Sequence, residues 1–358
     1  MQPEASREAK KMKYVGVDIG KWKCRAAMMD PEGTIMEEFT FPNDAEGIRN
    51  LASRLTAEDR VVMESTGSVW TTLYNNLEER RIPVTLANPL KTKAIASARI
   101  KTDKVDARIL AHLLRSDLVA ECYVPPRELR EIRTLVRHRA GLVRMRSTVK
   151  NRVHALLDER GQWCAYSDLF GKRSLKWLRE LELGSLDRLM LDNHLCHVES
   201  LNAQIGRVDV EVRRRASLDE DARLLLSLTG VYVYTALLIR SQIGDIGRFP
   251  DYKRLVSWAG LAPSLHQSGS VEIHGGVTKQ GSKMLRWIMV EAARSAVRHD
   301  ERMRWFYERV KRRRGDGKVI VAVACKMLKI IWFMLTRREP YMSRNERRYG
   351  VKLKSLEG

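Results

Sequence analysis

Four acidic residues in the first third of the chain have the types and positions that could hold divalent metal ions. Asp18 and Glu64 each end a short apolar run, while Asp103 and Asp106 stand three residues apart at the start of a helical pattern. Two divalent ions can activate an attacking oxygen and stabilise a leaving oxygen in phosphoryl transfer. Carboxylates that converge on one point would repel one another strongly without such ions. The sequence therefore predicts a site for Mg²⁺ or Mn²⁺, with two ions.

Each of these acidic residues also has a purely structural interpretation. An aspartate before a glycine at a strand end, as in Asp18-Ile19-Gly20, is often only a turn residue. Asp103 and Asp106 could simply favour the positive end of a helix dipole, with Thr102 as the cap. The prediction rests on all four residues together, on suitable elements in a suitable order.

The elements that must position these residues alternate between strand and helix. Short apolar runs bounded by turn residues predict strands over 14–18, 24–30, 34–41, 60–64 and 83–87. Helical patterns predict helices over about 44–55, 68–80, 89–98 and 103–115. Three strands, then helix, strand, helix, strand and helix is the order of an α/β RNase H-like (RuvC-like) fold, although many α/β domains alternate in this way.

After Pro125 the pattern changes to long amphipathic helices. The range 127–160 has no turn signal until Gly161, and its apolar residues repeat every seven positions at Leu135, Leu142, Val149 and Leu156. A second stretch, 183–216, is its natural antiparallel partner. Two interpretations stay open: helices packed within their own chain, or a coiled-coil-like arm that pairs subunits and lays a basic face on nucleic acid.

The region beyond Asp219 is mostly helical, with a Gly- and Ser-rich loop predicted over 260–281. These changes of pattern predict three modules: a catalytic α/β domain over 1–124, a helical arm over 125–218 and a mainly α C-terminal domain over 219–358. The most apolar stretch, 319–335, is interrupted by Lys326 and Lys329. Lysines at mid-span are costly in hydrocarbon, so a buried helix is expected rather than a membrane span.

Composition points to a polyanionic partner. The chain has 65 Lys and Arg against 44 Asp and Glu, a net charge of +21, and a pI of about 10.0. Such a surplus favours nucleic acid, because basic groups placed on phosphates release condensed counterions. The five cysteines show no CxxC spacing, so neither a disulfide framework nor a zinc ribbon is predicted, and a reducing cytoplasm fits.

Two blocks of sequence resemble a known family. The first block includes Tyr14-Val-Gly-Val-Asp-Ile-Gly-Lys21, Val62-Met-Glu-Ser-Thr-Gly67, Asn88-Pro89 and Lys101-Thr-Asp-Lys-Val-Asp-Ala-Arg108. The second includes Phe249-Pro250, Trp258-Ala-Gly-Leu-Ala-Pro263, Gln267-Ser-Gly269 and Gly276-Val-Thr-Lys-Gln-Gly281. In this order they resemble the DEDD transposases of the insertion-sequence one-ten family, which are related to the Piv DNA invertases and, in catalytic fold, to the RuvC resolvases.

The resemblance implies a Mg²⁺-dependent DNA recombinase, a homodimer or homotetramer that acts on element ends and target DNA in the bacterial cytoplasm, close to the nucleoid. It also implies a serine nucleophile in the second block, and in some members a structured guide RNA encoded by the element. Ser268 is the candidate, with Ser264 and Ser270 as alternatives. Whether the serine and the carboxylates meet within one subunit or across an interface is left open.

Several alternatives accompany this resemblance. The same carboxylates would serve a RuvC-type endonuclease that uses water, and a non-catalytic basic protein could keep the scaffold. The range 224–249 resembles a helix-hairpin-helix, but its turn at 229–232 lacks the usual second glycine, so a structural hairpin is at least as consistent. Trp258 is expected in the core. Phosphate contacts are predicted, with a solvated basic face as the alternative, for Arg137, Arg144, Lys150, Lys279, Lys283 and Arg286.

Overall fold

The computed structural model describes residues 12–64, 67–89, 91–92, 103–268 and 271–356, with the side chains of 103–105, 264–274, 314, 316 and 317 outside that description. The chain forms two compact units, Met1–Val124 and Pro125–Gly358. This division falls where the sequence pattern changes. The further division of the second unit at 218/219 stays a prediction, and the helix predicted over 89–98 lies mostly outside the described residues.

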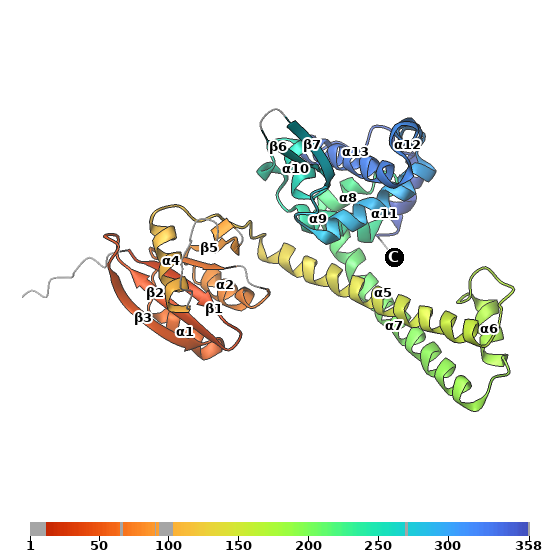
Figure 1. Ribbon diagram of the computed structural model, residues 1–358, viewed down its shortest axis with the longest axis horizontal. Coiled ribbons are helices and arrows are strands. Elements are labelled where there is room, and N and C mark those ends of the chain that lie inside the picture. The colour runs from red at the N-terminus through yellow and green to blue at the C-terminus, as the bar shows by residue number, and fades with distance from the viewer. Residues whose placement is uncertain (1–11, 65–66, 90, 93–102, 269–270, 357–358) are drawn as a thin grey trace, which may run out of the picture. The chain divides into compact units, whose positions relative to one another are not determined.

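A five-stranded mixed sheet forms the centre of the first unit (Figure 1). Its strands are β1 (Tyr14–Ile19), β2 (Lys23–Met29), β3 (Ile35–Pro42), β4 (Arg60–Glu64) and β5 (Val84–Ala87). They lie in the order β3-β2-β1-β4-β5. Strand β2 is antiparallel to both β1 and β3, whereas β4 is parallel to β1 and β5 is parallel to β4. All five predicted strands agree with the structure to within one residue at either end.

Three helices cover the two faces of this sheet. They are α1 (Ala45–Ser53), α2 (Trp70–Glu79) and α4 (Asp103–Arg115). Helices α1 and α2 cover one face, where Val15 and Val61 belong to the same buried cluster as Leu51. Helix α4 covers the other face, where Val62 packs with Leu110. Because side chains alternate along a strand, each strand residue is assigned to the α1/α2 face or to the α4 face.

Helix α4 packs against β1 at a point where no side chain separates the two backbones. A Cβ atom on Gly16 would lie 2.1 Å from the carbonyl oxygen of Ala107 and 2.5 Å from the amide nitrogen of Ala111. Both alanines are fully buried. Glycine at position 16, facing alanines one helical turn apart, allows this approach and fixes the height of α4 over the sheet.

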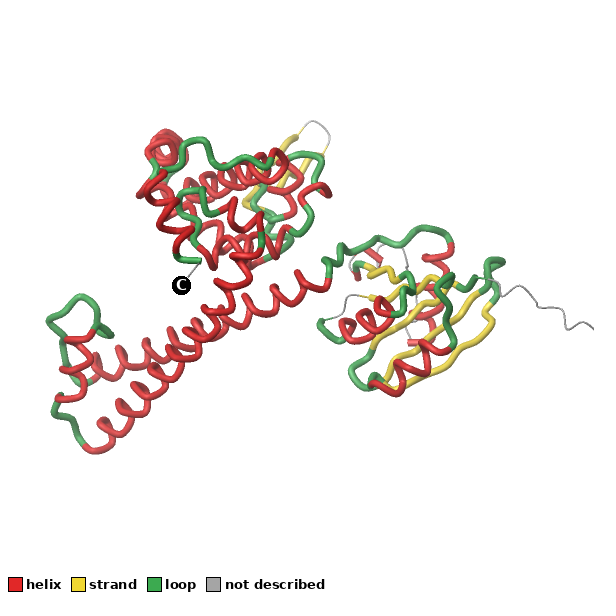
Figure 2. The backbone as a smooth tube through the Cα atoms, turned by 180° about the vertical axis from the view of Figure 1, so that it is seen from behind, coloured by secondary structure: helices red, strands yellow, loops and turns green. Residues whose placement is uncertain are grey.

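The second unit begins with a pair of long helices, α5 (Arg127–Glu159) and α7 (Ser185–Leu218), which lie side by side (Figures 1 and 2). Side-chain hydrogen bonds join them along their length: Arg139 to Asp209 at 2.5 Å, Arg146 to Asn202 at 2.9 Å and Arg160 to Asp187 at 2.6 Å. The residue numbers of these partners increase along α5 while they decrease along α7, so the predicted antiparallel pairing is confirmed. The seam residues Leu142, Val149 and Leu156 are buried within the chain. Pairing between subunits stays a prediction.

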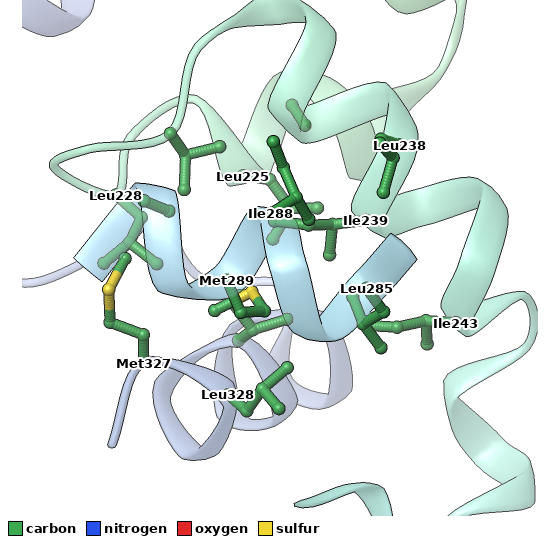
Figure 3. Close-up of a cluster of buried hydrophobic side chains, with 14 of the residues drawn as sticks. Leu225, Leu228, Leu238, Ile239, Ile243, Leu285, Ile288, Met289, Met327 and Leu328 are labelled. Atoms are coloured by element: carbon green, nitrogen blue, oxygen red, sulfur yellow. The ribbon is translucent and has the colours of Figure 1, made fainter. Parts of the chain in front are cut away.

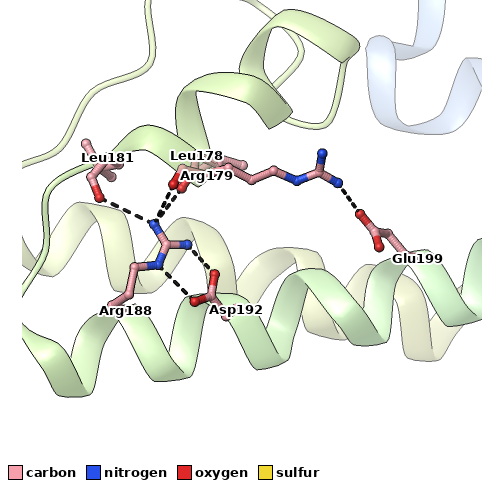
Figure 4. Close-up of polar contacts among 6 residues, drawn as sticks. All are labelled: Leu178, Arg179, Leu181, Arg188, Asp192 and Glu199. Carbon is pink, nitrogen blue, oxygen red and sulfur yellow. Dashed lines mark hydrogen bonds and ion pairs between the residues drawn. The ribbon is translucent and has the colours of Figure 1, made fainter.

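The far end of this pair is closed by α6 (Lys172–Glu180), where Leu178 and Leu191 are fully buried. Arg188 of α7 donates to the carbonyl oxygen of Leu178 at 2.9 Å and to the Asp192 carboxylate at 2.5 Å, as Figure 4 shows. Arg188 also reaches the carbonyl of Leu181, beyond the last turn of α6. A cation at a helix C-terminus satisfies carbonyls that have no partner within the helix.

The remainder of the second unit is mainly helical. Its elements are α8 (Glu220–Leu225), α9 (Val233–Ile243), the short 3-10 helix η1 (Ile246–Arg248), α10 (Tyr252–Trp258), α11 (Lys283–His299), α12 (Glu301–Arg314), α13 (Asp316–Arg337) and α14 (Glu346–Lys354). Leu238, Leu285 and Met327 bring α9, α11 and α13 into one core (Figure 3). Leu129 of α5 and Val212 of α7 belong to the same core.

The most apolar stretch of the sequence forms helix α13. By length and composition alone this helix could cross a membrane, with a mean hydropathy of 2.1. Its residues Val323, Met327 and Ile331 are nevertheless fully buried in the core of the second unit. This packing agrees with the predicted buried helix.

The segment predicted as a Gly- and Ser-rich loop over 260–281 instead contains a two-stranded hairpin. Strand β6 (Pro263–Ser268) pairs antiparallel with β7 (Val271–Val277), and Ser268 pairs with Val271. The loop prediction was wrong because a hairpin is held by backbone hydrogen bonds, so polar and small residues can occupy it when the turn is short. Ser268 therefore ends β6 beside the hairpin turn.

Two glycines hold the base of this hairpin. A Cβ atom on Gly281 would lie 1.9 Å from the carbonyl oxygen of Trp258, and one on Gly260 would lie 2.1 Å from the carbonyl oxygen of Gln280. Both glycines have positive φ angles, 97° and 69°. The segments on either side of the hairpin thus cross in close backbone contact, which other residues would prevent.

We expect Gly16→Ala to destabilise the first unit by about 1–3 kcal/mol, because two backbone atoms of α4 must move to admit the methyl group. Hydrogen exchange of peptides from β1 and α4 across a urea series measures this loss. Gly141→Ala is the matched control, since nothing lies within 4 Å of a Cβ at that position of α5. Equal protection of β1 in Gly16→Ala and in the wild type would contradict the close packing.

Gly281→Ala is expected to loosen the base of the β6–β7 hairpin, by about 1–3 kcal/mol from the positive φ alone. Amide exchange of hairpin peptides should become faster while that of α9 is unchanged. Gly276→Ala, which adds a Cβ with nothing within 4 Å, should leave the hairpin as it is. If both variants exchange alike, the two-glycine contact does not hold the hairpin.

Candidate functional site

Asp18 and Glu64 end neighbouring parallel strands. The register of β1 and β4 pairs Val17 with Met63, so the next step along both strands places Asp18 beside Glu64. Val17 and Met63 belong to the cluster under α1 and α2. By alternation, both half-buried carboxylates face the α4 side of the sheet. The sheet order thus places these two strand ends side by side.

Helix α4 runs antiparallel to β1, so it begins near the edge where these carboxylates lie. Arg115, in its last turn, donates to the carbonyl oxygen of Pro31 at 3.4 Å, in the turn between β2 and β3. That turn follows Met29, which pairs with Tyr14 at the start of β1. The C-terminus of α4 thus lies over the start of β1, and its N-terminus lies toward the end of that strand.

The two aspartates of α4 lie in this first part of the helix. Asp106, which is half buried, directly precedes Ala107, the residue in contact with Gly16. Asp103 lies one turn before Ala107 and therefore on the helix face that packs on the sheet. The side chain of Asp103 lies outside the described residues. The backbone brings the start of α4 to the edge that carries Asp18 and Glu64.

An arginine that the sequence analysis missed lies on the same face. Arg25 of β2 is paired with Asp18 in the β1–β2 ladder. Its guanidinium is 3.7 Å from Glu38 of β3, and Glu38 also accepts a hydrogen bond from Arg108 of α4 at 2.9 Å. The Nε atom of Arg25 is buried and has no hydrogen-bond partner among the described atoms. Only the register of the sheet shows that this cation lies beside the carboxylates, where it could hold a phosphate oxygen.

The donor chemistry of this edge suits hard divalent cations. Cys24, next to Arg25 in sequence, is buried, and burial raises the pKa of its thiol to about 11, with the Asp18 charge acting in the same direction. A thiol that stays protonated at neutral pH is a poor metal ligand. The oxygen donors of this edge are the carboxylates of Asp18, Glu64 and Asp106, and Mg²⁺ and Mn²⁺ prefer oxygen ligands of this kind.

A complete metal-binding cluster is not formed by the side chains that the structure describes. Among them, no three His, Cys, Asp or Glu side chains are grouped closely enough to hold a metal ion. Asp103, the fourth predicted ligand, is outside that set. The four-ligand site therefore stays a prediction, supported by the strand register and by the position of α4.

The candidate serines lie on and beside the hairpin. Ser268 is the last residue of β6, and Ser264 is the second residue of the same strand. Their side chains lie outside the described residues, as does the whole of Ser270. The backbone places Ser268 next to the turn and Ser264 near the base, so the two candidates are separated along the hairpin.

The basic residues predicted on α5 differ in their surroundings. The side chains of Arg137 and Arg144 are exposed and form no hydrogen bond or ion pair within the described part of the chain. Lys150 is half buried, with its Nζ atom 4.3 Å from the centre of the Phe170 ring. Burial first, and then the charge of Arg146, lower the pKa of Lys150. Arg137 and Arg144 are thus available to an external anion, whereas Lys150 contributes to packing.

The basic residues predicted near the hairpin also differ in their surroundings. Lys279 and Lys283 are exposed. Arg286 instead donates to the carbonyl oxygen of Ala259 at 3.2 Å, so it supports the base of the hairpin. Trp258 is half buried and packs edge-on against Phe249 at 5.5 Å between ring centres, which confirms its predicted place in the core.

The turn that resembles a helix-hairpin-helix is used for packing. Gly230, between α8 and α9, has a φ of +86°, and a Cβ there would lie 2.3 Å from the carbonyl oxygen of Ala292 in α11. This close contact accounts for the glycine without any ligand. The structural interpretation of the turn is therefore favoured.

Two parts of the sequence match transposase families of the IS110 type. Residues 15–161 match the DEDD transposases of the IS110 type, and residues 222–308 match the transposase IS116/IS110/IS902 family. The first match contains Asp18, Glu64, Asp103 and Asp106, and the second contains Ser268.

Similar proteins extend over nearly the whole chain. The transposase for insertion sequence element IS1111A of Coxiella burnetii is 29% identical over 94% of this chain and 93% of its own length. The pilin gene-inverting protein of Moraxella bovis is 26% identical over 92% of this chain and 98% of its own length. A putative transposase of Sinorhizobium fredii is 32% identical over 65% of this chain and 66% of its own length. Because both parts of the chain match transposases of this type in the same order, the chain belongs to the IS110 family of DEDD transposases.

Proposed function

We propose that this transposase cuts and rejoins DNA with a divalent-metal site in an RNase H-like first unit. The observation that carries the proposal is the placement of Asp18 and Glu64 on adjacent parallel strand ends, on the face that α4 covers. The strand order β3-β2-β1-β4-β5, with an antiparallel β1–β2–β3 meander, supports an RNase H-like fold. The similarity to insertion-sequence transposases supports DNA as the substrate.

Asp18, Glu64, Asp103 and Asp106 are the proposed ligands of two Mg²⁺ or Mn²⁺ ions. Bound there, the ions would activate the attacking oxygen and stabilise the leaving oxygen of the phosphodiester. The chain itself holds the carboxylates in place through the Gly16–Ala107 contact. Arg25, beside Asp18 in the ladder, is a proposed positioning residue for the scissile phosphate.

Ser268 is the proposed nucleophile. Its place at the end of β6 supports this role, because the backbone of the strand is anchored by the close contacts at the hairpin base. A serine hydroxyl needs a group that removes its proton before it attacks. The attack would join the serine oxygen to phosphorus and release one deoxyribose oxygen, leaving DNA covalently held by the protein.

The proposed partners of this reaction are nucleic acids and further copies of the chain. DNA ends and target DNA are the expected substrates, and Arg137, Arg144, Lys279 and Lys283 are exposed cations that suit phosphate contacts. A structured guide RNA and assembly as a homodimer or homotetramer in the bacterial cytoplasm remain predictions from the resemblance.

Asp18→Asn and Glu64→Gln should each reduce metal-dependent DNA cleavage by at least about 100-fold, because each removes an anionic ligand from the proposed two-metal site. Cleavage of element-end DNA with Mg²⁺, with Mn²⁺ and with EDTA provides the measurement. Glu58→Gln, at an exposed turn before β4, is the matched control. Full activity in EDTA, or in both ligand variants, would exclude the metal mechanism.

Ser268→Ala should abolish the covalent protein–DNA species and strand joining while leaving metal binding unchanged, because it removes the attacking oxygen. The covalent species is detected as a labelled band that survives denaturation. Ser264→Ala, on the same strand nearer the hairpin base, is the control and should retain it. Normal joining by Ser268→Ala would transfer the role to another group or to water.

A further inference from the structure

Helix α12 carries a concentration of positive charge that the proposed reaction does not use. It contains seven Arg and Lys residues and two Glu residues in 14 positions. Met303 is buried and Phe306 packs against the core, so one side of the helix is anchored. The charged sides face outward. A helix so basic costs electrostatic self-repulsion unless an anionic partner compensates it.

One flank of α12 combines these cations with an exposed aromatic ring. Arg302, Trp305 and Arg309 recur at three- and four-residue spacing and so lie along the same side of the helix. Trp305 is 62% exposed. The guanidinium carbon of Arg309 lies 4.6 Å from the centre of the Trp305 ring.

The neighbouring helix α13 adds further cations to this flank. The Nζ atom of Lys326 lies 4.3 Å from the centre of the Phe306 ring of α12. Lys329 follows one turn later on α13, at the margin of the flank, with its Nζ atom 4.5 Å from the centre of the Tyr252 ring of α10. Burial, followed by the charge of Arg309, lowers the pKa of Lys326, with Arg302 and Lys329 acting in the same direction and Asp300 opposing them. The charges of α12 and α13 thus repel one another across a single surface.

Carboxylates do not neutralise this surface within the described part of the chain. Arg302, Arg309 and Lys326 form no ion pair with any described acidic side chain. The nearby carboxylate of Asp300 accepts a hydrogen bond from the backbone amide of Met303 at 3.0 Å, and its charge opposes only part of the effect of the surrounding cations on Lys326. The exposed Glu301 and Glu308 lie four residues before and three residues after Trp305, on the side of the ring away from Arg302 and Arg309. The cationic side is therefore left for an external anion.

We propose that the α12–α13 flank, formed by Arg302, Trp305, Arg309, Lys326 and Lys329, binds an unpaired segment of DNA. The arginines and lysines would contact phosphates, and Trp305 would stack on an exposed base. This inference rests on the proposed function, because strand cleavage and exchange expose unpaired DNA.

The chemistry of the flank favours a single strand over the alternatives. In a duplex the base faces are covered by stacking, so an exposed tryptophan would gain little there. An acidic protein would satisfy the cations but would not require a flat ring. Unpaired DNA satisfies both the charge and the ring, with sequence-tolerant affinity that depends on salt.

The test is fluorescence anisotropy of a labelled oligothymidylate with the full-length protein in EDTA, over a series of salt concentrations. Trp305→Ala should weaken binding about tenfold, because one stacked base is lost, and should leave the salt dependence unchanged. Trp305→Phe should retain most of the affinity. Arg309→Gln should lower the slope of log affinity against log salt by about 0.7, since one phosphate contact is lost.

Matched variants separate a local effect from a general one. Trp163→Ala removes a tryptophan that is 78% exposed outside this flank, and Arg49→Gln removes an exposed helical arginine from α1. Both should bind as the wild type does. Three outcomes would each overturn the proposal. The first is an equal loss of affinity in Trp163→Ala and Trp305→Ala. The others are binding of duplex DNA that depends equally on Trp305, and tighter Trp305-dependent binding of an RNA of the same sequence.

Failure of this proposal can be told apart from failure of the proposed function. The effect of Trp305→Ala on oligothymidylate binding is measured in EDTA, without the ions that the proposed cleavage needs, and the metal ligands lie in the other unit. If Trp305-dependent binding persists while cleavage proves independent of metal, only the metal mechanism fails. If cleavage needs metal but Trp305→Ala binds as the wild type does, only the α12–α13 surface fails.

Discussion

The contact between Gly16 and the backbone of α4 is the constraint on which the candidate site depends. Without a Cβ at position 16, Ala107 and Ala111 approach the strand directly. This contact fixes where along β1 the helix begins, and so where Asp103 and Asp106 lie relative to the end of the strand. A larger residue would lift the helix and carry the backbone of both aspartates with it.

The same packing makes the site electrostatically costly. Apolar residues such as Val17 and Met63 bury one face of the sheet, and alternation then turns Asp18 and Glu64 together onto the other. Adjacent carboxylates repel one another, and Arg25 in the neighbouring strand offsets only part of that repulsion. Burial of the apolar face thus holds the two carboxylates on adjacent strands, and the divalent cations proposed above would relieve their repulsion.

The sequence predicted the elements better than their arrangement. Strand and helix bounds follow from local periodicity and turn signals, so the predicted bounds of β4 and α4 agree with the structure. The register that places Arg25 beside Asp18 depends on pairing between distant segments, which no local pattern encodes. The β6–β7 hairpin was missed because its stability comes from backbone pairing and from Gly260 and Gly281, rather than from apolar alternation.

The central claim is that three segments remote in sequence converge on one metal site. Replacing Mg²⁺ with Fe²⁺ and adding ascorbate generates hydroxyl radicals at the bound ion, and mass spectrometry then locates the cuts in the polypeptide. The account predicts cuts near Asp18, near Glu64 and near the start of α4, all suppressed by excess Mg²⁺. Cuts at only one of these segments, or a pattern that Mg²⁺ does not suppress, would contradict it.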